Sequence, residues 1–439
     1  MLNAAGLSLD QAPPIAVPFR FVLTAPLFAC AAGLILVWEG DGASVSRWTP
    51  PALAVVHLVS LGFLTQVMCG ALFQMLPVLA GAPVPAAVAA GRWTHGLLLA
   101  GTVGLCVGFV GGGWLWLTGG AALVTGSLAI FLGAIGRALA QAASGSQTVK
   151  AMRLSLAALA VTLGLGLTLV AYLSGWVHLD RFPEWVDIHL AWGLLGWAGI
   201  LIMAVGYQVV PMFHVTPPYP RWMLVWSAPL AFLGLTVALA LTGIGLGPYA
   251  AVGIGLSILS FVAFGLMTLG TQLRRQRRRV DATLLHWWIA IMAALAAAVL
   301  WLVSGPSLVV GVLALFGVGV GLPSGMLFKI VPFLCWFHLQ SRQVATQRFD
   351  YRIPTMHGFL AERAARFHVG VHVAALGLLI SGASIAPGMV RLAGLTLAIS
   401  SALLAGLLAH AAMVYRRHAA VLSAGASTPA SKIGGGTSW

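Results

Sequence analysis

Long apolar runs alternate with short polar segments along the whole chain. A helix needs about 20 apolar residues to cross a bilayer core of about 30 Å. Twelve runs meet that length, at approximately residues 19–38, 51–79, 94–117, 119–141, 152–175, 186–213, 222–244, 248–272, 283–303, 307–335, 367–386 and 390–415. None shows the alternation of apolar and polar residues that marks a membrane barrel strand. The pattern predicts an all-α polytopic membrane protein with 12 transmembrane helices.

The basic residues between the runs predict an orientation. If the N-terminus is placed in the cytoplasm, 19 of the 23 Lys and Arg residues fall on the inner side. Only Arg47, Arg181 and Arg391 fall outside, and Lys329 lies within a run. Cytoplasmic loops carry an excess of Lys and Arg. We therefore expect both termini to be cytoplasmic, in a bacterial-type inner membrane.

Composition narrows the class further. The 439 residues are 60% hydrophobic and 7% charged, whereas soluble domains carry about 25% charged residues. A soluble globule, a disordered chain and a nucleic-acid binder are disfavoured. The four cysteines lie within apolar runs and form no CxxC motif, so neither a disulfide framework nor a zinc finger is indicated.

The two ends of the chain differ from its middle. Residues 1–18 lack the charged region and cleavage site of a signal peptide, and we expect a cytoplasmic N-terminal segment. Residues 19–415 are expected to form one membrane domain. The last residues are small, polar and rich in glycine, so 416–439 is predicted to be a disordered cytoplasmic tail.

Three of the runs end alike. Run 51–79 ends in Phe-Gln-x-x-Pro at Pro77, run 186–213 in Tyr-Gln-x-x-Pro at Pro211, and run 307–335 in Phe-Lys-x-x-Pro at Pro332. These runs are four apart in order, which predicts three repeats of four helices, at about 19–141, 152–272 and 283–415. The alternative is that apolar helices share a composition and commonly end at proline.

The repeat places three polar side chains at one position. Gln74, Gln208 and Lys329 are expected to meet on a common axis near the cytoplasmic third of the membrane. A lysine at such depth is costly unless it faces a polar cavity or a partner. Alternatively, Lys329 extends its ammonium group to the inner surface.

Histidines supply the strongest candidate chemistry. His57 and His189 stand about a turn and a half inside the outer ends of two equivalent runs, at matched depth. Neutral imidazole ligates haem iron and copper, so the two could bind a haem axially or supply two copper ligands. The alternative is a pair of histidines that hydrogen-bond between helices. An acidic outer approach to His189 contains His178, Asp180, Glu184 and Asp187; it would dock a cationic partner or attract a metal ion.

Two weaker metal sites are also suggested by spacing. His368 and His372 share one helix face, four residues apart, and His214, His338 and His357 are candidates to approach them. The alternative interpretation is interfacial histidines, which we also expect of His286. Soft ligands could form a copper(I) ladder along the axis, although apolar filling explains them equally well: Met68, Cys69, Met75, Met203, Met212, Met326 and Cys335.

Twelve helices in three arcs of four, with these histidines, resemble subunit I of the haem-copper oxidases and nitric oxide reductases. The resemblance implies that His57 is an axial ligand of a low-spin haem and His189 a copper ligand. Run 222–244 lacks the family's adjacent histidine pair, and residues 310–312 contain no histidine. The chain is therefore most similar to a degenerate relative without a complete oxygen-reducing centre, distantly similar to the haem- and copper-containing NnrS proteins.

Three functional hypotheses follow. The first is a b-type haem protein, with copper as a second candidate cofactor, that transfers electrons to a partner at the outer face or handles a diatomic gas or haem. If it is an enzyme, it is a haem-dependent oxidoreductase. The second is a permease for copper(I) or a small solute that uses Gln74, Gln208 and Lys329. The third is an accessory or assembly subunit of a respiratory complex.

Overall fold

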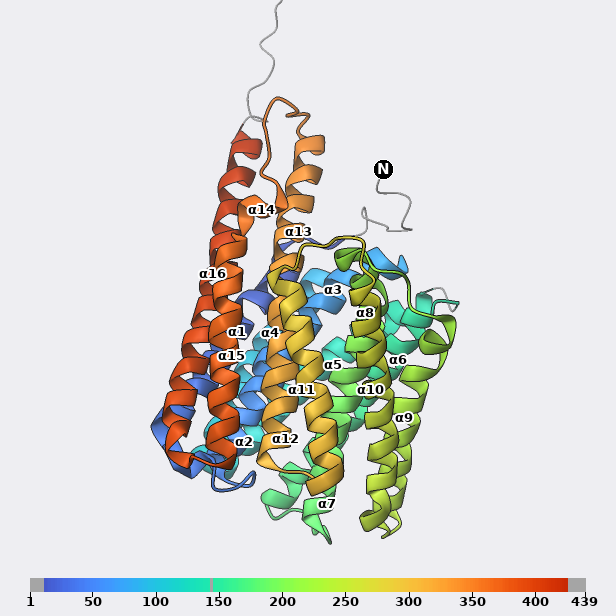
Figure 1. Ribbon diagram of the computed structural model, residues 1–439, viewed down its shortest axis with the longest axis vertical. Coiled ribbons are helices and arrows are strands. Elements are labelled where there is room, and N and C mark those ends of the chain that lie inside the picture. The colour runs from blue at the N-terminus through green and yellow to red at the C-terminus, as the bar shows by residue number, and fades with distance from the viewer. Residues whose placement is uncertain (1–11, 143–144, 425–439) are drawn as a thin grey trace, which may run out of the picture.

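The computed structural model describes residues 12–142 and 145–424, and within these ranges every regular element is a helix. Eleven helical segments are long and apolar enough to cross a membrane. The polytopic all-α class predicted from the apolar runs is therefore confirmed. The helices form one bundle with roughly aligned axes, and α13 and α16 extend past the others at one end (Figure 1). We call this the protruding end.

The helices follow most of the predicted runs, but the chain reverses at residues 111–113, inside the predicted run 94–117. Their bounds are α1 (Ala16–Glu39), η3 (Gly40–Ala43), α2 (Pro50–His57), η4 (Leu58–Thr65), α3 (Gln66–Ala80), α4 (Ala87–Val107), η5 (Gly108–Gly112), α5 (Gly113–Gln141), α6 (Gln147–Leu173), α7 (Phe182–Ala191), η6 (Trp192–Gly199), α8 (Ile200–His214), α9 (Arg221–Gly243), η7 (Gly247–Tyr249), α10 (Ala250–Leu273), α11 (Ala282–Ser304), α12 (Leu308–Val312), η8 (Leu313–Val320), α13 (Gly321–Ala345), α14 (Met356–Phe359), α15 (Glu362–Ser384), η9 (Pro387–Met389) and α16 (Val390–Ala424).

One of the eleven segments, Ala87–Gln141, contains a chain reversal. Gly111 and Gly113 adopt φ angles of 121° and 79°, which side chains with a Cβ rarely tolerate. Beyond this turn α5 runs back along α4, and a Cβ on Gly104 would lie 3.2 Å from the Cα of Gly120. The segment therefore consists of two antiparallel helices in close contact.

Three composite helices share an unusual feature. In α2–η4–α3, α7–η6–α8 and α12–η8–α13, an eight-residue π-helical segment separates two α-helical parts. The prolines expected at equivalent positions are each the twelfth residue of the α-helix that follows: Pro77 in α3, Pro211 in α8 and Pro332 in α13. Single π turns are rare and frequently accompany functional sites.

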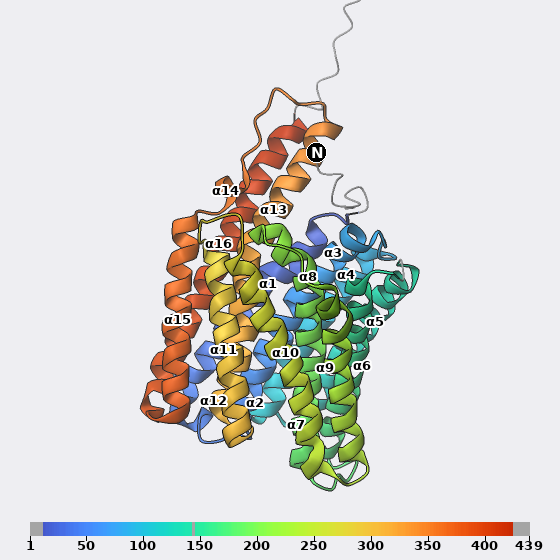
Figure 2. The ribbon, with the colours of Figure 1, turned by 45° about the vertical axis from the view of Figure 1, so that its right-hand side comes forward.

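The two ends of the described chain are joined in space. Helices α1 and α16 lie side by side in both ribbon views (Figures 1 and 2). Small residues allow this close approach, because a Cβ on Gly33 would lie 2.5 Å from the carbonyl oxygen of Gly394. The first and last predicted spans thus close the bundle.

The predicted disordered tail begins too early. Helix α16 continues to Ala424, nine residues past the predicted boundary at 415. This extension packs along the extension of α13, where it buries Leu422 completely, and the hydroxyl of Tyr351 lies 2.6 Å from His418 Nδ1. Tertiary packing therefore orders residues 416–424. Residues 425–439, and residues 1–11 of the predicted N-terminal segment, lie outside the described residues.

Candidate functional site

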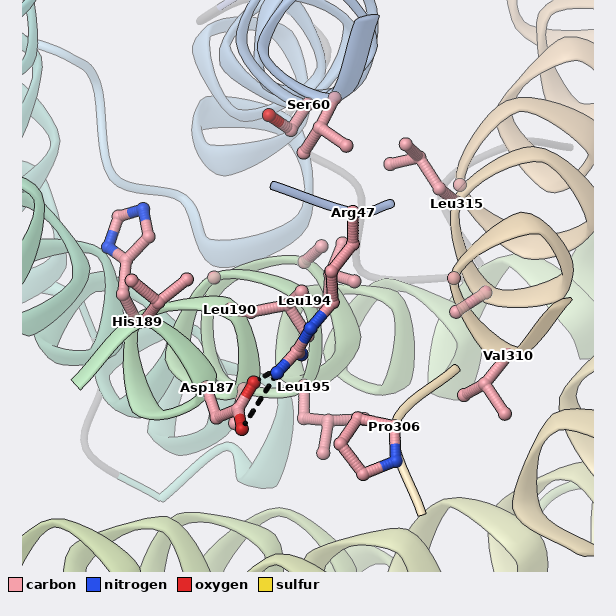
Figure 3. Close-up of a pocket in the computed structure, with 18 of the residues that line it drawn as sticks. Arg47, Ser60, Asp187, His189, Leu190, Leu194, Leu195, Pro306, Val310 and Leu315 are labelled. Atoms are coloured by element: carbon pink, nitrogen blue, oxygen red, sulfur yellow. Dashed lines mark hydrogen bonds and ion pairs between the residues drawn. The ribbon is translucent and has the colours of Figure 1, made fainter. Parts of the chain in front are cut away.

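A cavity of about 800 Å³ lies toward the end of the bundle that contains α2, α7 and α12, opposite the protruding end. The three eight-residue π-helical segments η4, η6 and η8 all contribute to its wall, for example through Ser60, Leu194 and Leu315 (Figure 3). Most of the lining is apolar, and the volume falls within the range of about 300–1,000 Å³ typical of small-molecule and cofactor sites. The composite helices thus converge on one ligand-sized space.

His57 and His189 both line this cavity. Each is the eighth residue of its helix, α2 or α7, so the two occupy equivalent positions along their helices. A Phe109 ring lies over His57, with ring centroids 4.9 Å apart. The two histidines chosen from the sequence therefore share one site.

Both imidazoles present one nitrogen to a backbone carbonyl. His57 Nδ1 lies 2.7 Å from the carbonyl oxygen of Leu53, and His189 Nδ1 lies 3.1 Å from that of Thr162. A carbonyl oxygen only accepts, so each Nδ1 donates its proton and each Nε2 keeps a lone pair. Neither Nε2 forms a hydrogen bond within the described part of the chain. Metal-ligating histidines are commonly held in this way.

An ion pair stands at the cavity wall. The Arg47 guanidinium donates to both carboxylate oxygens of Asp187, at 2.5 and 3.3 Å (Figure 3). Arg47 also stacks on Trp48, with its guanidinium carbon 4.4 Å from the ring centroid. It is the only Lys or Arg among the residues that line the cavity. Arg47 has a role that was not predicted from the sequence. The sequence did mark it as one of only three basic residues expected on the outer side.

The predicted acidic approach to His189 is paired with positive or titratable groups. Asp180 lies 3.3 Å from His178 and Glu184 lies 3.4 Å from Arg181, while Asp187 pairs with Arg47. Of this group, Glu184 and Asp187 line the cavity. Pairing leaves less free negative charge than the sequence suggests.

In α12–η8–α13, the positions expected to correspond to His57 and His189 carry only apolar residues. Val310 and Val312 both line the cavity. The cavity therefore receives two imidazoles, as the sequence indicated.

The polar side chains expected on a common axis have separate neighbours. Gln208 Nε2 donates to Thr148 Oγ1 at 3.3 Å, and Gln74 Oε1 has no partner. Lys329 Nζ lies 2.7 Å from Asp281 Oδ2. No hydrogen bond joins Gln74, Gln208 and Lys329 to one another within residues 12–142 and 145–424.

Asp281, which the sequence analysis missed, precedes α11 and caps it. Its Oδ1 accepts from the backbone N–H of Leu284 at 3.0 Å, while its Oδ2 faces Lys329. Burial acts to raise the pKa of this carboxyl, but the hydrogen bond and charge of Lys329 outweigh it and hold the pKa below its usual range. Asp281 thus fixes α11 to α13 near the protruding end.

The histidines toward the protruding end meet a neighbour that was not expected. His368 and His372 on α15 pack against His286 of α11, and all three are buried. The interpretation of His286 as an interface residue is therefore wrong. His214 instead lies 3.1 Å from Gln272, and His338 packs against Phe337. As the side chains stand, no group of three or more His, Cys, Asp or Glu in the described ranges is arranged to hold a metal ion.

The sulfur groups proposed as a copper ladder have other contacts. Met326 Sδ accepts from Trp287 Nε1 at 3.1 Å, and Cys335 Sγ lies 3.7 Å from the carbonyl oxygen of Ala411. Cys69 is fully buried. These contacts favour the alternative in which the side chains fill the apolar interior.

No protein-family model matches the chain, and no curated protein matches it either. The cavity and the residues that line it are therefore the features that bear on function.

Proposed function

We propose that the chain is a membrane protein with twelve crossing helices, built as three repeats of four, with both termini on the cytoplasmic side of a bacterial-type inner membrane. The 55-residue segment Ala87–Gln141 supplies two of the twelve crossings. Equal π-helical segments and equally placed prolines in α2–η4–α3, α7–η6–α8 and α12–η8–α13 support the repeat.

Within this framework the chain binds one b-type haem through His57 and His189. The proposal is supported mainly by the hydrogen bonding that the two histidines share. Each donates Nδ1–H to a carbonyl, has no hydrogen-bond partner for Nε2 within the described residues, and lines the same cavity. The donor set fits, because His57 and His189 would supply two neutral imidazoles, which are ligands that haem iron accepts. The cavity volume of about 800 Å³ fits a ligand of cofactor size.

The remaining cavity residues have roles that suit such a ligand. Haem supplies one-electron redox chemistry when bound. The apolar wall excludes water from the site, and Phe109 restricts the His57 ring. Arg47 is the cation available to a haem carboxylate, and Asp187 and Trp48 hold it in place. Because the cavity contains no third imidazole, we assign electron transfer or the handling of a diatomic gas or haem, rather than oxygen reduction.

A reduced-minus-oxidised optical spectrum of the purified protein, with iron analysis of the same sample, tests the proposal. We expect a sharp b-type α band and about one iron per chain. Protein made with ample haem that contains no iron and shows no α band would contradict it.

A matched pair of glycines on α6 makes the test specific to the site. A Cβ at Gly166 would lie 3.0 Å from His189 Cε1, whereas a Cβ at Gly164 would meet no atom within 4 Å. Gly166→Ala should therefore broaden or shift the α band or reduce haem content, while Gly164→Ala should leave both unchanged. Equal behaviour of the two variants would argue against His189 as a ligand.

Transport is the second candidate, favoured by the size and apolar wall of the same cavity. In this case the site would bind a small solute near the outer face, with the Arg47–Asp187 pair at its wall. Saturable uptake into proteoliposomes by haem-free protein would support transport over the haem proposal. A respiratory accessory subunit would instead co-purify with stoichiometric partners.

A further inference from the structure

Three buried imidazoles form a second group, separate from the cavity. His286 comes from α11, and His368 and His372 come from α15; their exposed fractions are 0%, 1% and 2%. Their ring centroids are 5.3 Å apart for His286–His372, 5.4 Å for His286–His368 and 6.2 Å for His368–His372. We call this group the histidine cluster.

The cluster has more nitrogen atoms than hydrogen-bond partners. His286 Nε2 lies 3.3 Å from His368 Nδ1, and His368 Nε2 lies 3.4 Å from Ser400 Oγ. His286 Nδ1 and His372 Nε2 are buried and have no partner. Leaving such atoms unpaired in an apolar interior is unfavourable. A metal ion bound through His372 Nε2 would satisfy one of these two atoms.

The spacing of the rings is that of imidazoles around a metal ion. At a metal–nitrogen distance of about 2.0–2.1 Å, two tetrahedral ligands stand about 3.3–3.4 Å apart, and their ring centroids about 5 Å. The separation of His286 Nε2 from His368 Nδ1 and two of the three centroid distances agree with this geometry.

The third ring needs a side-chain rotation. The rings of His368 and His372 are nearly parallel, with 8° between their planes, so their nitrogens do not converge. His372 Nε2 instead faces Gly321, where a Cβ would lie 2.9 Å from it. Because the nitrogens do not meet at one point, no three-ligand group is formed as the side chains stand. Turning His372 toward His286 would complete a three-nitrogen site.

The surroundings of the cluster favour an ion of low charge. Within the described ranges, no carboxylate or thiol is hydrogen-bonded or ion-paired to the three rings. Phe328 packs against His286 and His368, and Ser400 lies beside His368. The cost of burying an ion in an apolar medium rises with the square of its charge. Imidazole ligands suit zinc and copper, and the monovalent ion of the two is Cu(I).

We propose that His286, His368 and His372 bind one Cu(I) ion between α11 and α15. This site shares no residue with the candidate haem site and does not depend on it. The copper ligand implied by the sequence resemblance is His189, which lies on α7.

Copper titration of the detergent-purified protein tests the site. Cu(I) is added under reducing, oxygen-free conditions in competition with a chromogenic Cu(I) chelator. We expect one tightly bound Cu(I) per chain, at least tenfold weaker binding in His286→Gln and His368→Gln, and a smaller loss in His372→Gln. His410→Gln is the control, because His410 is exposed on α16, and it should bind as the unaltered protein does.

The same titration separates this site from the haem proposal. His57→Ala and His189→Ala should retain the Cu(I) site whether or not the protein contains haem. Cu(I) should also raise the apparent melting temperature of the unaltered protein, and it should raise that of His372→Gln by less. This comparison keeps the proposal testable if His286→Gln fails to fold. Absence of tight Cu(I) binding, equal binding by all variants, or tight binding of Zn(II) in place of Cu(I) would each overturn the proposal.

Discussion

The cavity and the histidine cluster use the same side chain in opposite settings. In the cavity, His57 and His189 each donate Nδ1–H to a backbone carbonyl, and neither Nε2 has a hydrogen-bond partner within the described residues. In the cluster, His286 and His368 contact each other, and neither residue lines this cavity. The difference shows that the backbone around a histidine, more than the histidine itself, decides what it can bind.

The backbone difference has an identifiable source. All three composite helices that enclose the cavity change to π-helical geometry at the same depth. The cluster lies instead between regular stretches of α11 and α15. Regular helices pack closely and bring rings into contact, whereas irregular turns frequently mark ligand sites.

The largest expected effect separates the two regions by ligand. His57→Ala or His189→Ala should abolish the haem α band, because each removes one axial ligand. His286→Gln should leave the band intact. Optical spectra of the three variants, at equal protein concentration, check this. A band that survives both alanine substitutions would remove the distinction between cavity and cluster.

The ion pair at the protruding end is expected to dominate stability. Lys329→Met leaves Asp281 buried without its partner, and such a loss typically costs about 3–5 kcal/mol; partial exposure of Lys329, at 20%, places the expected cost near the lower bound. Thermal unfolding in detergent measures it. Arg348→Gln, which breaks the exposed Arg348–Asp350 pair, is the control and should change little.

The second glycine pair tests the crowding of His372. Gly321→Ala places a Cβ 2.9 Å from His372 Nε2, whereas Gly370→Ala on α15 meets no atom within 4 Å. Because the proposed site needs His372 turned away from Gly321, the added Cβ should favour the copper-binding orientation. Gly321→Ala should therefore bind Cu(I) at least as tightly as the unaltered protein, and Gly370→Ala should bind as the unaltered protein does. Weaker binding by Gly321→Ala alone would contradict the proposed rotation of His372.

Removing the positive or the negative charge at the cavity wall should shift the reduction potential of the haem in opposite directions. Arg47→Gln removes a cation and leaves Asp187 unpaired, so the reduction potential should fall, because added negative charge disfavours the gain of an electron. Asp187→Asn should raise it. Potentiometric titration of both variants measures the shifts; equal signs would contradict the placement of the pair beside the haem.

The smallest expected effect is the pH dependence that Asp281 gives to the free energy of unfolding. Because its pKa in the folded protein lies below the usual value, the ionised carboxylate stabilises the fold. This contribution is complete above the pKa of the unfolded chain, about 4, and is lost as the pH falls through the lower folded pKa. Unfolding curves should therefore show it to be constant between pH 7 and 5 and reduced in stronger acid. Asp281→Asn should remove that acid dependence.

The sequence by itself determined the class and the course of the chain. Apolar runs of sufficient length dictate helices because a lipid environment leaves no other partner for backbone groups. The Phe/Tyr–polar–x–x–Pro endings also anticipated the register of Pro77, Pro211 and Pro332, and the depth of His57 and His189 followed from counting residues along their helices.

Tertiary structure decided the contacts between distant residues. The partners Asp281 and Lys329, Arg47 and Asp187, and His286 and His368 are 48, 140 and 82 residues apart. No local periodicity encodes such pairs, because helix rotation and close packing select which faces meet. The same packing accompanies the helix over residues 416–424, which lie beyond the predicted end of the last span at 415: Leu422 is completely buried, and Arg342 of α13 donates to Ser423.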